Sequence, residues 1–238
     1  MNYAIKLEEV KVVHRTRIEW TQLSWSPIVG CLHGCWYCYA RKFAIRFPKN
    51  FPNGFRPTFY PDRLKEPWNL KKPSKIFVCS VSDLFAPWTR VEWRDAVLES
   101  IFKCPVKHTF QLLTKNPERI PPIKFPPNVW VGTTVTNENR DWRNISEIIR
   151  VDAKVRFVSF EPLLSPLPRI LCLRELEWII VGKLTGSRRV KLERKWVEDI
   201  INEARNHNIP IFIKNNVNWP DKIQEFPSEG CPWKEKGK

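Results

Sequence analysis

The sequence of this protein predicts an α/β fold, a partial (β/α) barrel of about six or seven parallel strands, built as one domain over residues 1–238. Three observations lead to this prediction. Short runs of β-branched and aromatic residues recur along the chain, helical patterns of apolar residues fall between them, and polar residues follow most of the runs. An open, doubly wound sheet shows the same alternation of strands and helices and is the alternative architecture.

The predicted strands are apolar at nearly every position rather than at every second position. Continuous runs of this kind are typical of strands that are buried on both faces of a parallel sheet. Six of them are Ile76–Cys79, Thr109–Leu113, Val129–Gly132, Val155–Val158, Trp178–Val181 and Ile209–Ile213.

Apolar residues at helical spacing lie between these runs, at residues 40–47, 93–101, 142–149 and 192–204. Thr89 and Glu92 have the spacing of a capping box and predict the start of the second of these helices. The first helix should end at Pro48 and pack Phe43 and Phe47 into the core together with two alanines.

Two segments fall outside this alternation. Residues 48–73 are rich in proline, asparagine, phenylalanine and tryptophan, which predicts an irregular insertion of the kind that often carries function. Residues 215–238 follow the last predicted strand and form a C-terminal extension.

The composition indicates a basic globular protein, with 40 lysines and arginines against 25 aspartates and glutamates and a formal net charge of +15. Such a charge attracts polyanions, although a basic solvated surface gives the same total. Seven cysteines are an odd number and a poor disulfide framework, which favours a reducing compartment. No membrane span and no signal peptide are recognisable. We therefore expect a soluble, cytoplasmic protein that does not bind membranes.

Polar side chains follow five of the predicted strands: Ser80, Ser82 and Asp83; Lys115 and Asn116; Thr133 and Thr134; Ser159 and Glu161; Lys214 and Asn215. Helix caps and turns use the same residue types. In barrels and open parallel sheets, however, function lies beyond the carboxyl ends of the strands. The recurrence at five ends therefore predicts a functional site at this edge.

Cys31, Cys35 and Cys38 form a tight triplet in a loop that contains Gly34. Three thiolates on a glycine-containing loop can hold an iron–sulfur cube and leave one iron without a protein ligand, which is the open position that catalysis requires. Zinc held by the same cysteines and His33 is the alternative and would make the protein a nucleic-acid-binding module without catalysis. A closed electron-transfer cluster would need a fourth cysteine, for which Cys79 is the candidate.

These residues resemble the radical S-adenosylmethionine superfamily, whose signature has the same cysteine spacing with an aromatic residue before the last cysteine. Within it, the chain resembles a phage-associated family of radical-SAM-like proteins that also occurs in bacteria and archaea. The resemblance runs nearly end to end through Ile18–Thr21, Trp25–Pro27, Ser80–Phe85, Leu113–Arg119, Asn128–Gly132 and Ser159–Leu164. The turn Gly182-Lys183-Leu184 departs from that family, which has an acidic residue there.

The resemblance implies that Cys31, Cys35 and Cys38 hold a 4Fe–4S cluster whose open iron binds S-adenosylmethionine. An electron donor such as ferredoxin or flavodoxin would drive reductive cleavage to methionine and a 5′-deoxyadenosyl radical. It also implies roles for the strand-end residues. Tyr37 would pack near the adenine, and the methionine amino group would contact Ser80, Ser82 and Asp83. Thr133 and Thr134 would contact the ribose or the methionine carboxylate, and Lys115 would contact a carboxylate. Glu161 would contact cofactor or substrate.

Two basic stretches bear on the substrate. Residues 41–56 contain five basic and no acidic residues, with phenylalanines between them, and residues 183–195 are similarly basic. Basic and aromatic residues together suit contacts to phosphates and bases. If both stretches surround the barrel mouth, the substrate is expected to be a nucleic acid or nucleotide.

Overall fold

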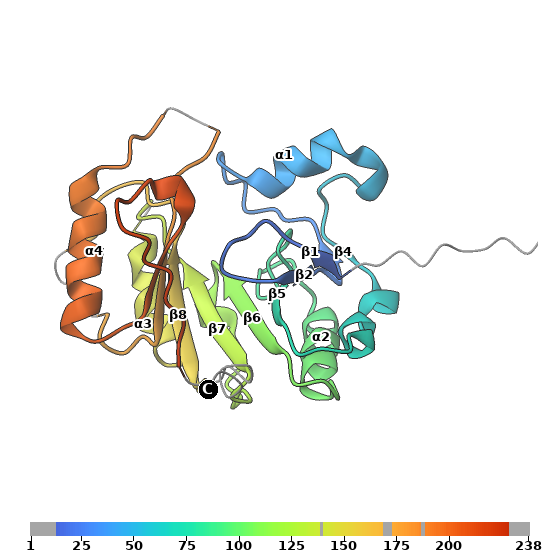
Figure 1. Cartoon of the computed structure of the whole chain (residues 1–238). Coiled ribbons are helices and arrows are strands. Elements are labelled where there is room, and N and C mark those ends of the chain that lie inside the picture. The colour runs from blue at the N-terminus through green and yellow to red at the C-terminus, as the bar shows by residue number, and fades with distance from the viewer. Residues whose placement is uncertain (1–12, 139, 169–172, 187–188, 229–238) are drawn as a thin grey trace, which may run out of the picture.

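The computed structural model describes residues 13–138, 140–168, 173–186 and 189–228. Its main element is an eight-stranded sheet in the order β1-β2-β5-β6-β7-β8-β9-β10 (Figure 1). The strands are β1 (His14–Arg15), β2 (Leu23–Trp25), β5 (Lys75–Val78), β6 (Thr109–Thr114), β7 (Val129–Thr134), β8 (Val155–Phe160), β9 (Trp178–Val181) and β10 (Ile211–Ile213). β1 pairs antiparallel with β2, and every other neighbouring pair is parallel.

The order of the strands identifies the architecture. A doubly wound sheet reverses its order at a switch point. Within the described part of the chain the order follows the sequence without reversal, and only β3 (Ile28–Val29) and β4 (Thr58–Phe59) leave the sheet to form a separate antiparallel ribbon. The sheet has β1 and β10 at its edges and does not close. The predicted α/β fold with an open, partial barrel is confirmed, and the doubly wound alternative is wrong.

The two faces of the sheet are buried by different means. The outer face packs against α2 (Val91–Phe102), α3 (Asn144–Ile148) and α4 (Arg194–Asn206), which contribute aliphatic residues such as Val97, Ile148 and Ile200. The inner face carries a separate cluster of large aromatic residues: Trp20, Phe77, Trp130, Phe157, Trp178 and Phe212. Side chains alternate between the two faces along each strand. Because both faces are buried, each strand is a continuous apolar run in the sequence.

A close contact between neighbouring strands makes room for these rings. Gly132 in β7 lies opposite Phe157 in β8. A Cβ at Gly132 would come within 2.6 Å of the Phe157 ring. The glycine is therefore required by the aromatic filling of the inner face rather than by backbone conformation.

The predicted helices form, with three local differences. α2 begins after Arg90 without a side-chain cap, so the capping box is wrong, and the Thr89 hydroxyl instead donates to the carbonyl of Asp83 at 2.9 Å. The helix expected over residues 142–149 is reduced to the five residues of α3, preceded by a 3₁₀ turn at Asp141–Arg143. The helix after the cysteines, α1 (Tyr39–Arg46), buries only its alanines, and Phe43 and Phe47 are exposed.

The chain between β2 and β5 contains the cysteines, α1 and the predicted insertion. Within residues 48–73 the backbone forms 3₁₀ turns at Pro48–Asn50, Pro61–Arg63 and Glu66–Asn69, together with β4. α1 lies apart from the other three helices, at the top of Figure 1. After β10, the chain makes a further 3₁₀ turn at Asn215–Val217, and residues 229–238 of the predicted C-terminal extension lie outside the described residues. No helix in the described ranges combines the length and apolarity needed to cross a bilayer.

Candidate active site

A cavity of about 690 Å³ lies at the carboxyl edge of the sheet. Residues at the carboxyl ends of six different strands, or just after those ends, line it: Ser80, Ser82 and Asp83; Lys115; Thr134; Ser159 and Glu161; Lys183; Lys214. Cys31, Cys35, Cys38 and Tyr37 line the same cavity from the loop that precedes α1. The parallel arrangement thus brings together side chains that are far apart in the sequence, as expected for this class of fold.

The backbone holds the cysteine loop in a defined shape. Gly30 has a φ of +93°, and a Cβ there would lie 2.3 Å from the carbonyl oxygen of Arg56, so glycine is required. The amide of Gly30 donates to Val81 at 3.1 Å, and the amide of Cys31 donates to Phe55 at 3.1 Å. At the other end of the loop, the Cys38 thiol accepts the Arg41 amide at 3.3 Å and caps α1. The loop is therefore anchored at both ends before any metal binds.

The chemistry of the three thiols fits a cationic metal centre. Burial raises the pKa of the Cys31 thiol to about 12, and the negative charges of Asp83, Cys35 and Cys38 add to the effect. A positive group at this wall would lower the pKa and favour the thiolate. Among the described residues, no three His, Cys, Asp or Glu side chains converge on one metal ion. An iron–sulfur cube offers a separate iron to each thiolate, so it needs only that the three cysteines surround one space.

His33, the fourth ligand in the zinc alternative, lines the cavity with the cysteines, but its Nε2 is already engaged by protein groups. Its Nε2 lies 2.9 Å from Oδ2 of Asp83 and 3.2 Å from Nδ2 of Asn116. The edge of its ring meets Trp88, with the ring centroids 4.7 Å apart. His33 thus anchors the loop to the ends of β5 and β6.

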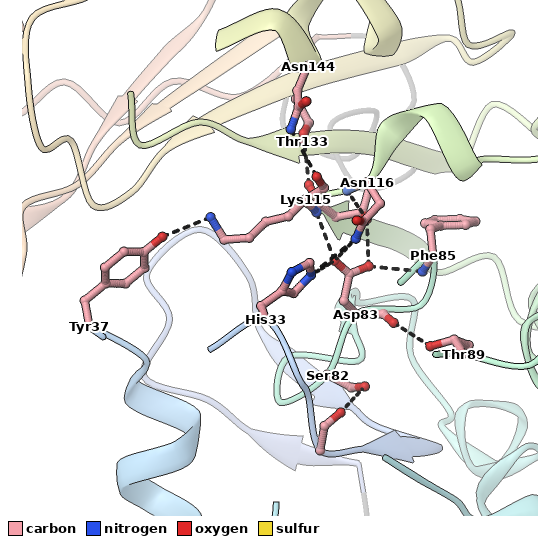
Figure 2. A network of polar contacts seen from close by, with 12 residues as sticks. His33, Tyr37, Ser82, Asp83, Phe85, Thr89, Lys115, Asn116, Thr133 and Asn144 are labelled. Atoms are coloured by element: carbon pink, nitrogen blue, oxygen red, sulfur yellow. Dashed lines mark hydrogen bonds and ion pairs between the residues drawn. The ribbon is translucent and has the colours of Figure 1, made fainter. Parts of the chain in front are cut away.

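Asp83 is the centre of this anchor, as Figure 2 shows. Its carboxylate accepts hydrogen bonds from the backbone of Phe85 and Lys115, from the Thr114 hydroxyl and from the Asn116 amide, at 2.6–3.0 Å, and it contacts His33 as well. Because a carboxylate has about four acceptor sites, these groups occupy all of them. We therefore interpret Asp83 as a positioning residue, although the resemblance assigned it to the methionine amino group.

Two other predicted contacts are also occupied by protein partners. The Ser82 hydroxyl donates to the carbonyl of Gly30 at 2.7 Å, which ties β5 to the cysteine loop. Thr133 is fully buried outside the cavity lining and donates to the carbonyl of Thr114 at 2.9 Å. Its neighbour Thr134 lines the cavity, because successive residues of a strand point to opposite faces.

Tyr37 and Lys115 meet across the cavity. The Lys115 ammonium donates to the Tyr37 hydroxyl at 3.0 Å (Figure 2). Burial raises the pKa of the Tyr37 phenol well above its usual value, so the phenol stays neutral. The contact joins the cysteine loop to the end of β6 and keeps both side chains at the cavity wall.

Glu161 forms an ion pair with Lys214, which the sequence had not singled out as a partner. Gly182 supports the pair, because a Cβ there would lie 2.8 Å from Cγ of Glu161 and 3.1 Å from Cδ of Lys214. Lys183 lines the cavity beside them. This part of the wall is therefore positive overall.

Several lining residues were not predicted. Trp20 and Phe77 extend the inner aromatic cluster into the cavity, and Arg17 and Tyr39 also line it. Trp36, in the cysteine loop, is not among the lining residues; its Nε1 donates to Glu138 at 2.8 Å, and the Arg189 guanidinium lies 5.4 Å from its ring centroid. The aromatic residue between two of the cysteines was the available signal for Trp36, whereas Arg17 carries no recognisable pattern.

The sequence matches one family, described as Protein of unknown function (DUF5131), over residues 15–230. A search of the curated proteins gives no match. Two solved structures of spore photoproduct lyase are similar in fold. One is a mutant with bound AdoMet and dinucleoside spore photoproduct, at a TM-score of 0.56, and the other is complexed with dinucleoside spore photoproduct, at 0.54. Each is 8% identical and covers 87% of this chain and 79% of its own. The fold of this chain is therefore similar to that of spore photoproduct lyase.

Proposed function

Since this chain belongs to the DUF5131 family of proteins of unknown function, we propose from its site that it is a radical S-adenosylmethionine enzyme that acts on nucleic acid. One observation carries the proposal. Three cysteines and the polar ends of six strands line a single cavity, in a fold similar to that of an enzyme with bound AdoMet. The narrower resemblance to a phage-associated family remains a prediction.

Cys31, Cys35 and Cys38 would hold a 4Fe–4S cluster at the wall of the cavity. When bound, the cluster and S-adenosylmethionine supply the reducing electron, from a donor such as ferredoxin or flavodoxin, and the 5′-deoxyadenosyl radical. Cys79 is a poor fourth ligand, because it is buried in the core and does not line the cavity. Within the described ranges, three thiols line the cavity, which favours an open cluster over a closed electron-transfer centre.

The remaining lining residues would bind and orient the cofactor. Thr134 and the Lys115–Tyr37 pair offer hydroxyl and ammonium groups toward the cavity, in line with the roles that the resemblance implies. Ser80 also lines the cavity, with its hydroxyl paired to that of Ser24. Ser82 and Asp83 would act through the shape of the loop. Glu161 would meet cofactor or substrate together with Lys214.

The aromatic floor would exclude water from the reaction. Trp20, Phe77 and Leu113 line the inner end of the cavity and continue into the fully buried aromatic cluster. A reactive radical survives to meet its substrate only where side reactions with solvent are prevented. A largely apolar floor suits this requirement.

The substrate class is proposed from charge and from the likeness in fold. Arg17, Lys115, Lys183 and Lys214 line the cavity against two acidic residues. One of these acids is paired with Lys214, and the other is the buried Asp83. A positive cavity attracts phosphodiesters. A solved structure of similar fold contains a dinucleoside lesion, so damaged nucleic acid is the first substrate to test.

Anaerobic purification and reconstitution test the proposal. Iron and sulfide at about four each per chain, together with 5′-deoxyadenosine formed after reduction, are the expected results. Cys35→Ala should lose both the cluster and the product. Cys104→Ala is the matched control, because Cys104 lies outside the cavity. Zinc without sulfide would overturn the proposal, and deoxyadenosine formation by Cys35→Ala would overturn the ligand assignment.

A further inference from the structure

One face of α1 carries a row of aromatic rings beside a row of basic side chains. Tyr39, Phe43 and Phe47 follow one another at intervals of four and are 56%, 45% and 40% exposed. Lys42 and Arg46 form the adjacent row of the same helix. The two rows together, Tyr39, Lys42, Phe43, Arg46 and Phe47, are called the α1 platform below.

Small residues hold the helix and leave these rings free. Ala40 and Ala44 are its buried positions, and Ala44 packs with Val29 and Phe51 in a cluster separate from the main core. The rings of Phe43 and Phe47 lie 4.6 Å apart and form a continuous surface. Exposed aromatic groups of this kind mark a surface that another molecule covers. The prediction that Phe43 and Phe47 pack in the core is therefore wrong.

The charge around the platform identifies what covers it. Residues 39–56 contain Arg41, Lys42, Arg46, Lys49 and Arg56 and no acidic residue. The Arg46 guanidinium lies 5.5 Å from the ring centroid of Phe47, which belongs to the platform. The Arg41 guanidinium lies 5.9 Å from the ring centroid of Phe55, which lies outside it. A polyanion that also has flat apolar faces satisfies both features, and single-stranded nucleic acid is such a ligand.

The platform is continuous with the cavity. Tyr39 and Phe43 belong both to the platform and to the cavity lining, and the Tyr39 hydroxyl donates to the carbonyl of Ser80. A strand lying along α1 would therefore reach the cavity mouth without a break. Unpaired bases are needed for stacking, because a duplex hides the base faces.

We propose that the α1 platform binds single-stranded nucleic acid, stacking bases on Phe43 and Phe47 and pairing phosphates with Lys42 and Arg46, so that a neighbouring nucleotide enters the cavity. This inference deepens the proposed function and rests on it for the fate of that nucleotide. Ring faces and phosphates are common to DNA and RNA, so the platform should accept both.

Fluorescence anisotropy with a labelled oligodeoxynucleotide tests the platform in the full-length protein, with and without the reconstituted cluster. Phe43→Leu with Phe47→Leu should weaken binding by about tenfold or more, because leucine keeps the apolar surface but offers no ring face. Phe43→Tyr with Phe47→Tyr should bind as the unaltered protein does. Lys42→Gln with Arg46→Gln should lower the slope of log K against log salt by about 0.7 for each phosphate that the variant no longer neutralises.

Phe102→Leu with Lys103→Gln is the matched control, because both residues are exposed at the end of α2. This end of the helix leads to the amino end of β6, whereas the cavity lies at the carboxyl ends of the strands. Melting curves establish that each variant is folded. Unchanged binding by the leucine pair, or equal affinity for a duplex, would overturn the inference. A strong preference for RNA of the same sequence would also overturn the inference. So would binding to vesicles of anionic lipid, if the leucine pair still showed that binding. Deoxyadenosine formed without oligonucleotide tests the proposed function separately, so that the two can fail independently.

Discussion

At the scale of single residues, the site separates side chains that face the cavity from side chains that build it. The family resemblance implies that the strand-end residues Asp83, Ser82 and Thr133 touch the cofactor. In the structure their polar atoms are bound to protein groups at 2.6–3.0 Å. The position of a residue at a strand end can be read from the sequence. Whether its lone pairs are already used depends on loops that arrive from elsewhere in the chain, and His33 and Asn116 carry no local signal for this.

Asp83→Asn should loosen the cysteine loop. The substitution replaces one acceptor oxygen by an amide that faces donors such as the Lys115 backbone, so it leaves buried groups unpaired and should cost about 1–3 kcal/mol in unfolding free energy. Alkylation of the cluster-free cysteines should also become faster. Denaturant unfolding and timed alkylation measure both effects. Asp95→Asn on the exposed surface of α2 is the control and should change neither. Equal behaviour of the two variants would show that Asp83 does not position the loop.

At the scale of elements, periodicity predicted which segments are helical but not which face each one buries. In α1 both the alanines and the phenylalanines recur at intervals of four, and the sequence predicted that all four residues share the buried face. The structure buries Ala40 and Ala44, because α1 lies at the cavity mouth rather than against the outer face of the sheet. The strands were predicted more closely, since a run that is apolar throughout is buried whichever face it presents. The short strands β1 and β3 have too few residues for any such pattern.

Within the segment 48–73, Glu66 should make stability depend on pH. Burial raises the pKa of its carboxyl to about 7, and one of its oxygens has no partner. Between the usual pKa of about 4.5 and 7, the folded state holds a proton that the unfolded state has released. The contribution of this group to the free energy of unfolding is therefore fully present below about pH 4.5 and is lost as the pH rises through 7.

Glu66→Gln keeps the shape of the neutral carboxyl and should remove this loss. We expect the variant to gain about 1 kcal/mol over the unaltered protein between about pH 5 and 7.5, less than the full shift implies because solvent reaches part of the side chain. Unfolding free energies of the two proteins, measured in parallel across this range, give the difference directly. Other titrating groups cancel in that difference. A difference that does not change with pH would mean that Glu66 is ionised in the folded protein.

At the scale of the whole molecule, the sequence predicted the class of fold and the edge at which the site lies. Both follow from general rules, since parallel strands in sequential order bring their carboxyl ends to one edge. The aromatic filling of the inner face and the route of residues 26–74 between β2 and β5 could not be predicted. They depend on long-range fits, such as Gly132 against Phe157 and Gly30 against Arg56, which leave no periodic trace.

Cluster binding should therefore stabilise one part of the molecule and leave the rest unchanged. Backbone hydrogen bonds within the cysteine loop or to its neighbours are made by the amides of Gly30, Cys31 and Cys38. The Asp83 carboxylate, which holds the loop, accepts hydrogen bonds from the amides of Phe85 and Lys115. A ligand that binds only the closed loop suppresses its local opening by RT ln(1 + [L]/Kd), so hydrogen exchange at these amides should slow by about a hundredfold at a hundred times Kd. Exchange in α4 and β10, which take no part in this network, should not change.

Reconstituted and cluster-free proteins compared by hydrogen–deuterium exchange would reveal the pattern, with Cys35→Ala as the unloaded control. Slowing spread evenly over the chain would instead indicate that the cluster acts on global unfolding and that the loop is not an independent unit.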